Sequence, residues 1–124
     1  MSDDIFVFTA QHRSPSEADL QAAVSEVDGL YIDVNTPPND LIMDSSIFAH
    51  ANGILGAFRI DTISYRGGKL DPVADLLKRF YVEVPALANP DSDGIFTIPE
   101  LVTLLRLSPA GSFHAFADPA KRRT

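Results

Sequence analysis

The sequence predicts a single two-layer α+β (or small α/β) domain, residues 1–124, in which helices pack on a short sheet of about three strands. Apolar, β-prone runs alternate along the chain with segments of helical periodicity, which is the pattern of a sheet covered by helices. The 124 residues suffice for one core, and 45% of them are hydrophobic, as in an ordinary globular protein. No internal repeat or linker-sized segment divides the chain.

Three segments are predicted to be strands because β-branched and aromatic residues dominate them. Residues 5–10 form a short, largely apolar run of the kind found in a buried strand. Residues 30–34 form a second such run, and residues 58–65 form a third in which polar and apolar side chains partly alternate. The phrase 35–39 is expected to be a loop, because its adjacent prolines fit neither a strand nor a helix interior.

Four helices are expected from capping residues and from apolar residues at helical spacing. The first lies between the serine–proline cap at 14–16 and the Asp-Gly turn at 28–29, and a second, of poor periodicity, is placed at about 44–52. The third begins at Asp71, and the last covers residues 98–107. The third has the clearest apolar stripe, which consists of Val73, Leu76, Leu77, Phe80 and Val84.

Charge and composition narrow the classes of partner. The formal net charge is -7 and the pI about 4.7, so the surface repels phosphate backbones and anionic membranes, and we expect neither nucleic acid nor membrane as a partner. The chain has no cysteine, and its start is acidic where a signal peptide would be basic. We therefore expect a soluble, cytoplasmic protein, with residues 117–124 as a basic tail.

One segment carries a specific chemical pattern, Asn89–Glu100, in which oxygen-bearing side chains recur at alternate positions. Ca²⁺ takes about six to eight oxygen ligands at about 2.3–2.6 Å, and such side chains can converge on it from one turn. Gly94 would permit the sharp bend, and Glu100 would close the site with two oxygens. The expected ligands are Asn89, Asp91, Asp93, the backbone carbonyl of Ile95, Thr97 and Glu100.

This spacing resembles the calcium loop of EF-hand proteins, and the resemblance implies a Ca²⁺ cofactor. It is confined to the loop and the helix after it. Position 1 is Asn89 where the family usually has aspartate, and Pro85 and Pro90 interrupt the turn where the entering helix of an EF-hand would lie. The chain has no second loop of this kind. The pattern therefore predicts a single site that shapes its own surroundings rather than a two-helix switch.

The same residues also fit a structure that needs no metal. Residues 91–94 make a good turn, and Thr97 followed by Glu100 is a capping box at the start of the last helix. Both interpretations remain open from the sequence.

A rival interpretation treats 97–109 as the first helix and turn of a DNA-binding helix-turn-helix unit, which this stretch resembles. Lys121, Arg122 and Arg123 could then contact phosphates. The would-be recognition helix, 110–116, has no side chain suited to base reading, and Arg106 stands where the turn usually has glycine.

An enzyme is the third alternative. Asp33 ends a predicted strand, where α/β folds often place a functional carboxylate, and Asp40 and Asp44 follow it. No nucleophile, base and orienting partner stand together in the sequence, and no phosphate loop is present.

We therefore expect a non-enzymatic interaction protein, an accessory or structural subunit that carries a single EF-hand-like calcium site. The alternatives are a calcium-dependent sensor or calcium-stabilised domain, the helix-turn-helix protein, and an enzyme with an acid site near Asp33. The missing catalytic set and the aromatic residues Phe113 and Phe116 near the C-terminus favour a protein partner or a larger assembly.

Overall fold

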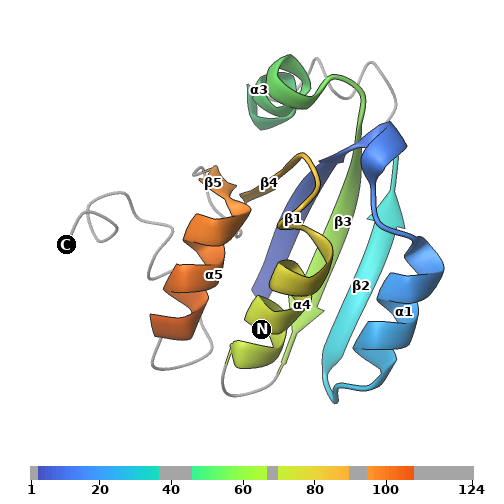
Figure 1. Cartoon of the computed structure of the whole chain (residues 1–124), viewed down its shortest axis with the longest axis vertical. Coiled ribbons are helices and arrows are strands. Elements are labelled where there is room, and N and C mark those ends of the chain that lie inside the picture. The colour runs from blue at the N-terminus through green and yellow to red at the C-terminus, as the bar shows by residue number, and fades with distance from the viewer. Residues whose placement is uncertain (1–2, 37–45, 67–69, 90–94, 108–124) are drawn as a thin grey trace.

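The strand β1 (Asp3–Ala10) lies at the centre of a five-stranded sheet with the strand order β2-β3-β1-β4-β5. The computed structural model describes residues 3–36, 46–66, 70–89 and 95–107, and Figure 1 shows these elements. The other strands are β2 (Leu30–Asn35), β3 (Phe58–Tyr65), β4 (Ala86–Asn89) and β5 (Phe96–Thr97). The helices are η1 (Gln11–Arg13), α1 (Glu17–Ser25), α3 (Ser46–Leu55), α4 (Asp71–Phe80) and α5 (Ile98–Leu107).

The expected α+β class is confirmed, but the expected number of about three strands is wrong. The three predicted strands are β1, β2 and β3, and the structure adds β4 and β5 on the side of β1 away from β3. These two strands have four and two residues, which is too short for a period of two to be recognised. These strands are defined by their backbone pairing: Ala88 of β4 pairs with Phe96 of β5, and Leu87 of β4 pairs with Phe8 of β1.

Each strand is antiparallel to its neighbours in the sheet. Two pairs of strands that are not neighbours run parallel to each other, and a crossover connection through a helix joins each pair. β1 and β2 both pair with β3 and so run parallel to each other, joined through α1. β3 and β4 both pair with β1 and are joined through α4. This split βαβ connectivity is that of the ferredoxin-like fold, with α3 inserted between β2 and β3 and with β5 and α5 appended. Such a connectivity is shared by proteins of many functions and by itself implies none.

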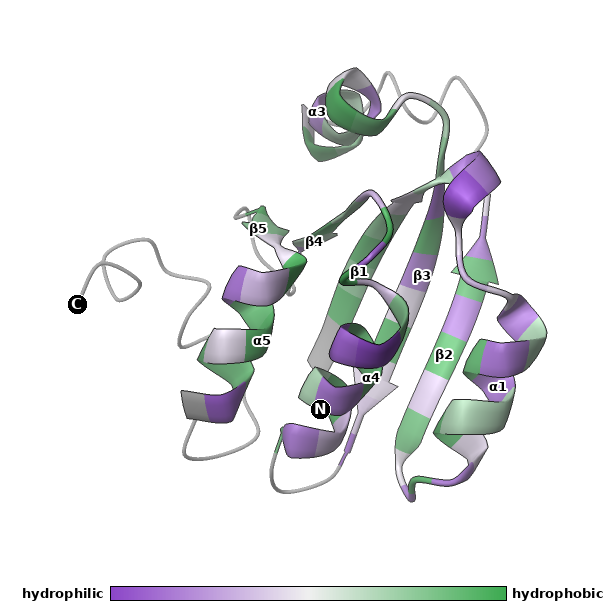
Figure 2. Ribbon diagram, in the orientation of Figure 1, coloured by the Kyte–Doolittle hydropathy of each residue, from purple (hydrophilic) through white to green (hydrophobic). Residues whose placement is uncertain are grey.

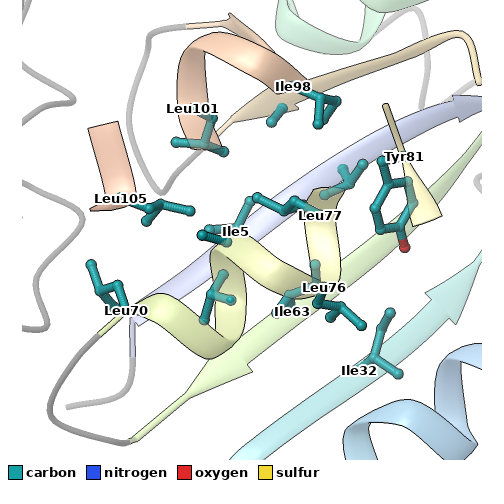
Figure 3. Packing of buried hydrophobic residues seen from close by; sticks show 14 of the residues in the cluster. Ile5, Ile32, Ile63, Leu70, Leu76, Leu77, Tyr81, Ile98, Leu101 and Leu105 are labelled. Atoms are coloured by element: carbon teal, nitrogen blue, oxygen red, sulfur yellow. The ribbon is translucent and has the colours of Figure 1, made fainter. Parts of the chain in front are cut away.

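The helices α1, α4 and α5 cover one face of the sheet, and the main core lies beneath them (Figure 1). Side chains alternate along a strand, so Ile5 and Val7 of β1 and Ile63 of β3 point to this face, where all three are fully buried. Figure 3 shows Leu77 of α4 and Leu101 of α5 converging on the same region. The outward face of α4 is mostly hydrophilic (Figure 2), as its predicted stripe requires.

The helix α3 packs on the opposite face, at one end of the sheet, so the expected two-layer arrangement is incomplete. Phe8, Phe48 and Phe58 form edge-to-face aromatic pairs there, with ring centroids 5.4–6.0 Å apart. These residues belong to a second, smaller core with Ala51. The even-numbered residues of β1 supply this second apolar face, which explains why the strand is apolar almost throughout.

The helix boundaries follow local chemistry. Ser16 caps α1, with its side chain accepting a hydrogen bond from the backbone N–H of Asp19. Gly29 has a φ of +79°, a left-handed conformation that glycine adopts without strain, and it turns the chain into β2. α3 ends later than the predicted residue 52, because Gly53 is accommodated within the helix, and the predicted start at residue 44 lies outside the described residues.

Candidate functional site

The predicted calcium loop joins the two strands of a hairpin. Asn89 is the last residue of β4 and is 4% exposed, while Ile95 directly precedes β5. Because Ala88 pairs with Phe96, the hairpin brings Asn89 and Ile95 to opposite ends of the same short loop. The element before the loop is thus a strand and not the entering helix of an EF-hand. Asp91 and Asp93 lie outside the described residues.

The far end of the loop forms the start of α5. The backbone N–H of Glu100 donates to Thr97 Oγ1 at 3.3 Å, so the predicted cap by Thr97 is present. Glu100 lies in the first helical turn and is exposed. Within the described residues, no group of three or more histidine, cysteine or acidic side chains is placed to hold a metal. Only four of the six predicted ligands belong to that part of the chain, so this does not test the predicted site.

The acid site proposed near Asp33 loses its structural premise. Asp33 lies exposed on β2, on the sheet face away from α1, and accepts a hydrogen bond from Asn35 Nδ2 at 3.0 Å. The rule that places functional carboxylates at strand ends applies to parallel sheets, and here the neighbouring strands are antiparallel. Asp40 and Asp44, the other members of the proposed cluster, lie outside the described residues.

The helix-turn-helix alternative is tested only at its first helix. That helix exists as α5, and it packs against α4 and the edge of the sheet. Residues 108–124, which would supply the recognition helix and the basic tail at 117–124, lie outside the described part of the chain.

A buried charged cluster, which the sequence patterns did not reveal, lies on the helix-covered face of β3. The carboxylate of Asp61 has no exposed side-chain area and accepts two hydrogen bonds from Arg59, one from Nε and one from Nη2, each of 2.7 Å. The hydroxyl of Tyr81 donates to the same carboxylate at 2.7 Å. Arg59 Nη1 donates to the backbone carbonyl of Pro15 at 2.8 Å. The paired side chains of Arg59 and Asp61 therefore connect β3 with the end of α4, through Tyr81, and with the chain entering α1, through Pro15.

The electrostatics of this cluster favour a protonated Tyr81 hydroxyl and a charged Arg59 guanidinium. Burial raises the pKa of the Tyr81 hydroxyl above its ordinary range, and the charge of Asp61 and their hydrogen bond raise it further. Burial acts to lower the pKa of Arg59, but the hydrogen bond and negative charge of Asp61 outweigh it, and the pKa is raised. Every buried side-chain nitrogen and oxygen in the described residues has a hydrogen-bond partner. The cluster holds elements in place and offers no free polar atom to a ligand.

A sequence signal for this cluster does exist. Arg59, Asp61 and Ile63 are two residues apart on one strand, so all three share a face, and Ile63 assigns that face to the core. The other face of β3 is also apolar, because Phe58 and Ile60 pack towards α3. With hydrophobic residues on both faces, the alternation of β3 is blurred, and the burial of Arg59 and Asp61 cannot be read from it.

A groove with a volume of about 440 Å³ lies between α4 and α5. The two helices run antiparallel: Arg106 near the end of α5 makes ion pairs with Asp75 at 2.6 Å and Asp71 at 3.5 Å, near the start of α4. Val82 is 43% exposed beside this groove. The lining residues are Lys78, Val82, Pro99, Val102, Thr103 and Arg106. We call this feature the α4–α5 groove.

A smaller concavity of about 270 Å³ lies between the end of α1 and the start of α4. Its polar side chains are Glu26, Asp75 and Arg79. Asp75 is already paired with Arg106, and the guanidinium of Arg79 lies over the ring of Phe80, with 4.9 Å from its central carbon to the ring centroid. Of these three charged side chains, Asp75 is paired with a cation of the protein itself.

No helix within the described residues is long and apolar enough to span a bilayer. Comparisons of the chain with protein-family models, with curated proteins and with solved structures find no match. The chain's function must therefore be inferred from its own residues.

Proposed function

We propose that the protein is a non-enzymatic interaction protein, an accessory subunit that binds a protein partner through the α4–α5 groove. The observation that carries this proposal is the apolar floor of the groove, with Val82 left 43% exposed between two packed helices. Taking a valine side chain from full exposure to full burial contributes about 1.5–3 kcal/mol, so a partner that covers the exposed 43% of Val82 gains a part of this free energy. Concave apolar surfaces with a polar rim are typical of binding sites.

The walls of the groove are rigid, which lowers the entropic cost of binding. Leu77 of α4 and Leu101 and Leu105 of α5 are almost fully buried in the main core, and they fix the two helices relative to each other. A preformed site avoids the ordering of loops and side chains that otherwise offsets much of the gain from contact.

Substitution of Val82→Glu tests this function, because the side chain is half exposed and the change leaves the core intact. We expect Val82→Glu to remove a partner that copurifies with the tagged protein expressed in its source at native level. Ile54→Glu is the matched control: Ile54 is 58% exposed on α3, which packs on the opposite face of the sheet, it does not line the groove, and its substitution should retain the partner. A wild-type protein that is only a free monomer in native mass spectrometry, or a partner retained by Val82→Glu, would refute the proposal.

We also propose, as a second function, that the loop Asn89–Glu100 binds one Ca²⁺ that stabilises the β4–β5 hairpin. The proposal rests on the ligand-type residues at their spacing and on the hairpin register, which brings Asn89 and Ile95 together. The capped first turn of α5, which carries Glu100, supports it further. A strand before the loop is compatible with a local structural site, whereas a two-helix switch would require an entering helix.

The melting temperature in calcium and in chelator tests the second function, because a ligand that binds only the folded state must raise it. At a calcium concentration of about a hundred times the Kd, the stabilisation would be about 2.7 kcal/mol. Glu100→Gln should abolish the shift, and Glu83→Gln, an exposed acid outside the loop, should preserve it. An unchanged melting temperature at millimolar calcium would end this idea without affecting the α4–α5 groove.

A further inference from the structure

We propose that Gln21 of α1 blocks the free edge of β2, and that the strand it excludes is β2 of a second copy of the chain. We call this free edge the β2 edge; it lies at the end of the strand order opposite to β5. The inference is independent of the proposed partner, because the described residues that line the α4–α5 groove include none from α1 or β2.

The two edges of the sheet differ in length. At one edge β5 has only two residues, so it offers few backbone groups to a second chain. At the other edge β2 has six residues, and among the described strands it pairs only with β3. An edge strand of this length is a template for strand addition, because its outward N–H and C=O groups can bond to an extended chain. The β2 edge is therefore the one that requires protection.

The hydrogen-bond pattern shows which backbone groups of β2 point away from β3. The N–H of Arg66 donates to the carbonyl of Gly29 at 3.0 Å, and these two residues extend the register between β2 and β3. Bonded and unbonded pairs alternate along an antiparallel ladder. The residues of β2 whose N–H and C=O groups point outward are therefore Leu30, Ile32 and Val34.

One side chain occupies the middle of this outward row. Gln21 Nε2 donates to the carbonyl of Ile32 at 3.1 Å. Gln21 belongs to α1, which lies beside β2 in Figure 1, so the contact joins the helix to the edge of the sheet. At the start of the row, the N–H of Leu30 donates to the carbonyl of Val27 at 3.3 Å. The protein itself thus uses the central acceptor and one donor that an added strand would need.

The excluded strand is a copy of β2, because β2 complements itself. Two antiparallel copies related by a two-fold axis at Ile32 place the two Ile32 residues opposite each other, bonded through their outward groups. In this register Leu30 lies opposite Val34, which pairs apolar residues on the helix-covered face. On the other face Tyr31 lies opposite Asp33, so no like charges meet. A two-fold axis at Asp33 would instead place two aspartates opposite each other, which is unfavourable.

Gln21 acts at the centre of this pairing. Both carbonyls of the Ile32–Ile32 pair accept a hydrogen bond from Gln21 in the separate chains, so two side-chain bonds must break before two backbone bonds form. Exchanging one hydrogen bond for another gains little free energy, whereas an unbonded carbonyl favours the new partner. Removal of the glutamine side chain should therefore favour pairing.

Substitution of Gln21 by alanine tests the inference with the full-length protein. Gln21 is exposed and alanine is the better helix former, so α1 should be retained. In sedimentation velocity we expect a monomeric wild type and a concentration-dependent dimer of Gln21→Ala. Gln11→Ala, at an exposed glutamine outside α1 and β2, is the matched control and should remain monomeric. If Gln21→Ala does not fold, Gln21→Met, which also lacks the N–H donor, takes its place.

Substitutions of Tyr31 in the Gln21→Ala background identify the added strand. Tyr31 is 60% exposed, and in the proposed register it faces Asp33 of the second copy. Tyr31→Lys should form a dimer about twofold to thirtyfold tighter than that of Tyr31→Ala, because two symmetry-related pairs of opposite charges form. Tyr31→Asp should weaken the dimer, because like charges then lie opposite each other.

Hydrogen exchange and the size of the assembly complete the test. In the Gln21→Ala dimer the amide of Ile32 should exchange more slowly than in the wild-type monomer. The assembly should stop at a dimer, because pairing of the two β2 edges leaves only β5 at each end of the described sheet.

Four results would overturn the inference. A Gln21→Ala protein as monomeric as the wild type would show that Gln21 does not block the edge. Slow exchange of the Ile32 amide in the wild-type monomer would show that another part of the chain covers the β2 edge. Growth beyond a dimer, or equal dimer affinities of Tyr31→Lys and Tyr31→Asp, would show that the added strand is not β2 in the proposed register.

Discussion

Replacing Asp61 by asparagine tests the role of the buried charged cluster. The substitution keeps the size of the side chain but removes its charge and turns one acceptor oxygen into an N–H donor. Asp61 accepts three hydrogen bonds, two from Arg59 and one from Tyr81, and is fully buried. In Asp61→Asn the Arg59 guanidinium, whose side chain is only 13% exposed, keeps its charge without a counter-ion.

The expected loss of stability is large. Breaking a buried ion pair by removing one partner costs about 3–5 kcal/mol, because the remaining charge is uncompensated. A domain of this size has a free energy of unfolding of about 5–15 kcal/mol, so about a fifth of it or more is lost. The melting temperature should fall by about 10–20 °C, at about 3–5 °C for each kcal/mol.

Urea unfolding followed by circular dichroism measures the change, with Asp75→Asn as the matched control. Asp75 also pairs with an arginine, Arg106, at 2.6 Å, but its side chain is 68% exposed, and its loss should cost about 0–1 kcal/mol. The triple change Arg59→Met, Asp61→Leu and Tyr81→Phe removes all the charges together and should recover most of the stability. If Asp61→Asn costs no more than Asp75→Asn, the cluster does not hold the fold as described.

Three further predictions concern stability. Folding raises the pKa of Tyr81, so the contribution of this residue to the free energy of unfolding is fully present below the ordinary tyrosine pKa of about 10 and is lost as the pH rises above it. Urea titrations between about pH 9 and 11 should therefore show a smaller fall in the free energy of unfolding for Tyr81→Phe than for the wild type. Thr97→Ala removes the cap of α5 and should cost about 1 kcal/mol, measured in chelator so that calcium does not contribute. Leu101→Ala leaves a cavity at a fully buried position and should cost about 2–5 kcal/mol in the same assay, whereas a cost below 1 kcal/mol would mean that α5 is not anchored in the core.

Much of the secondary structure could be predicted from the sequence because its causes are local. The predicted strand at 58–65 and the predicted helix at 98–107 have the bounds observed for β3 and α5. The serine cap before α1 and the glycine after it act within a few residues of the chain. Propensity, capping and periodicity depend on residues that are close together in the chain, so they can be recognised from the sequence alone.

Of the predicted calcium site, the sequence determined the residue types and their spacing, and the tertiary structure decided their setting. Pairing between Ala88 and Phe96, which are eight residues apart, makes the element before the loop a strand. Backbone hydrogen bonds of this kind do not depend on which side chains are present, so a short strand leaves little trace in the residue types. Asp91 and Asp93, which lie outside the described residues, remain predictions from the sequence.

The sequence by itself determined an acidic α+β chain with capped helices, three strands and one calcium-type loop. Only the tertiary structure decided that Arg59 meets Asp61 and Tyr81 in the core and that Lys78 and Val82 share a groove with α5. Both arrangements join residues distant in the chain, and they depend on how the crossovers through α1 and α4 lay helices on the sheet. Contacts of that kind are specified by packing across the whole domain and not by any local pattern.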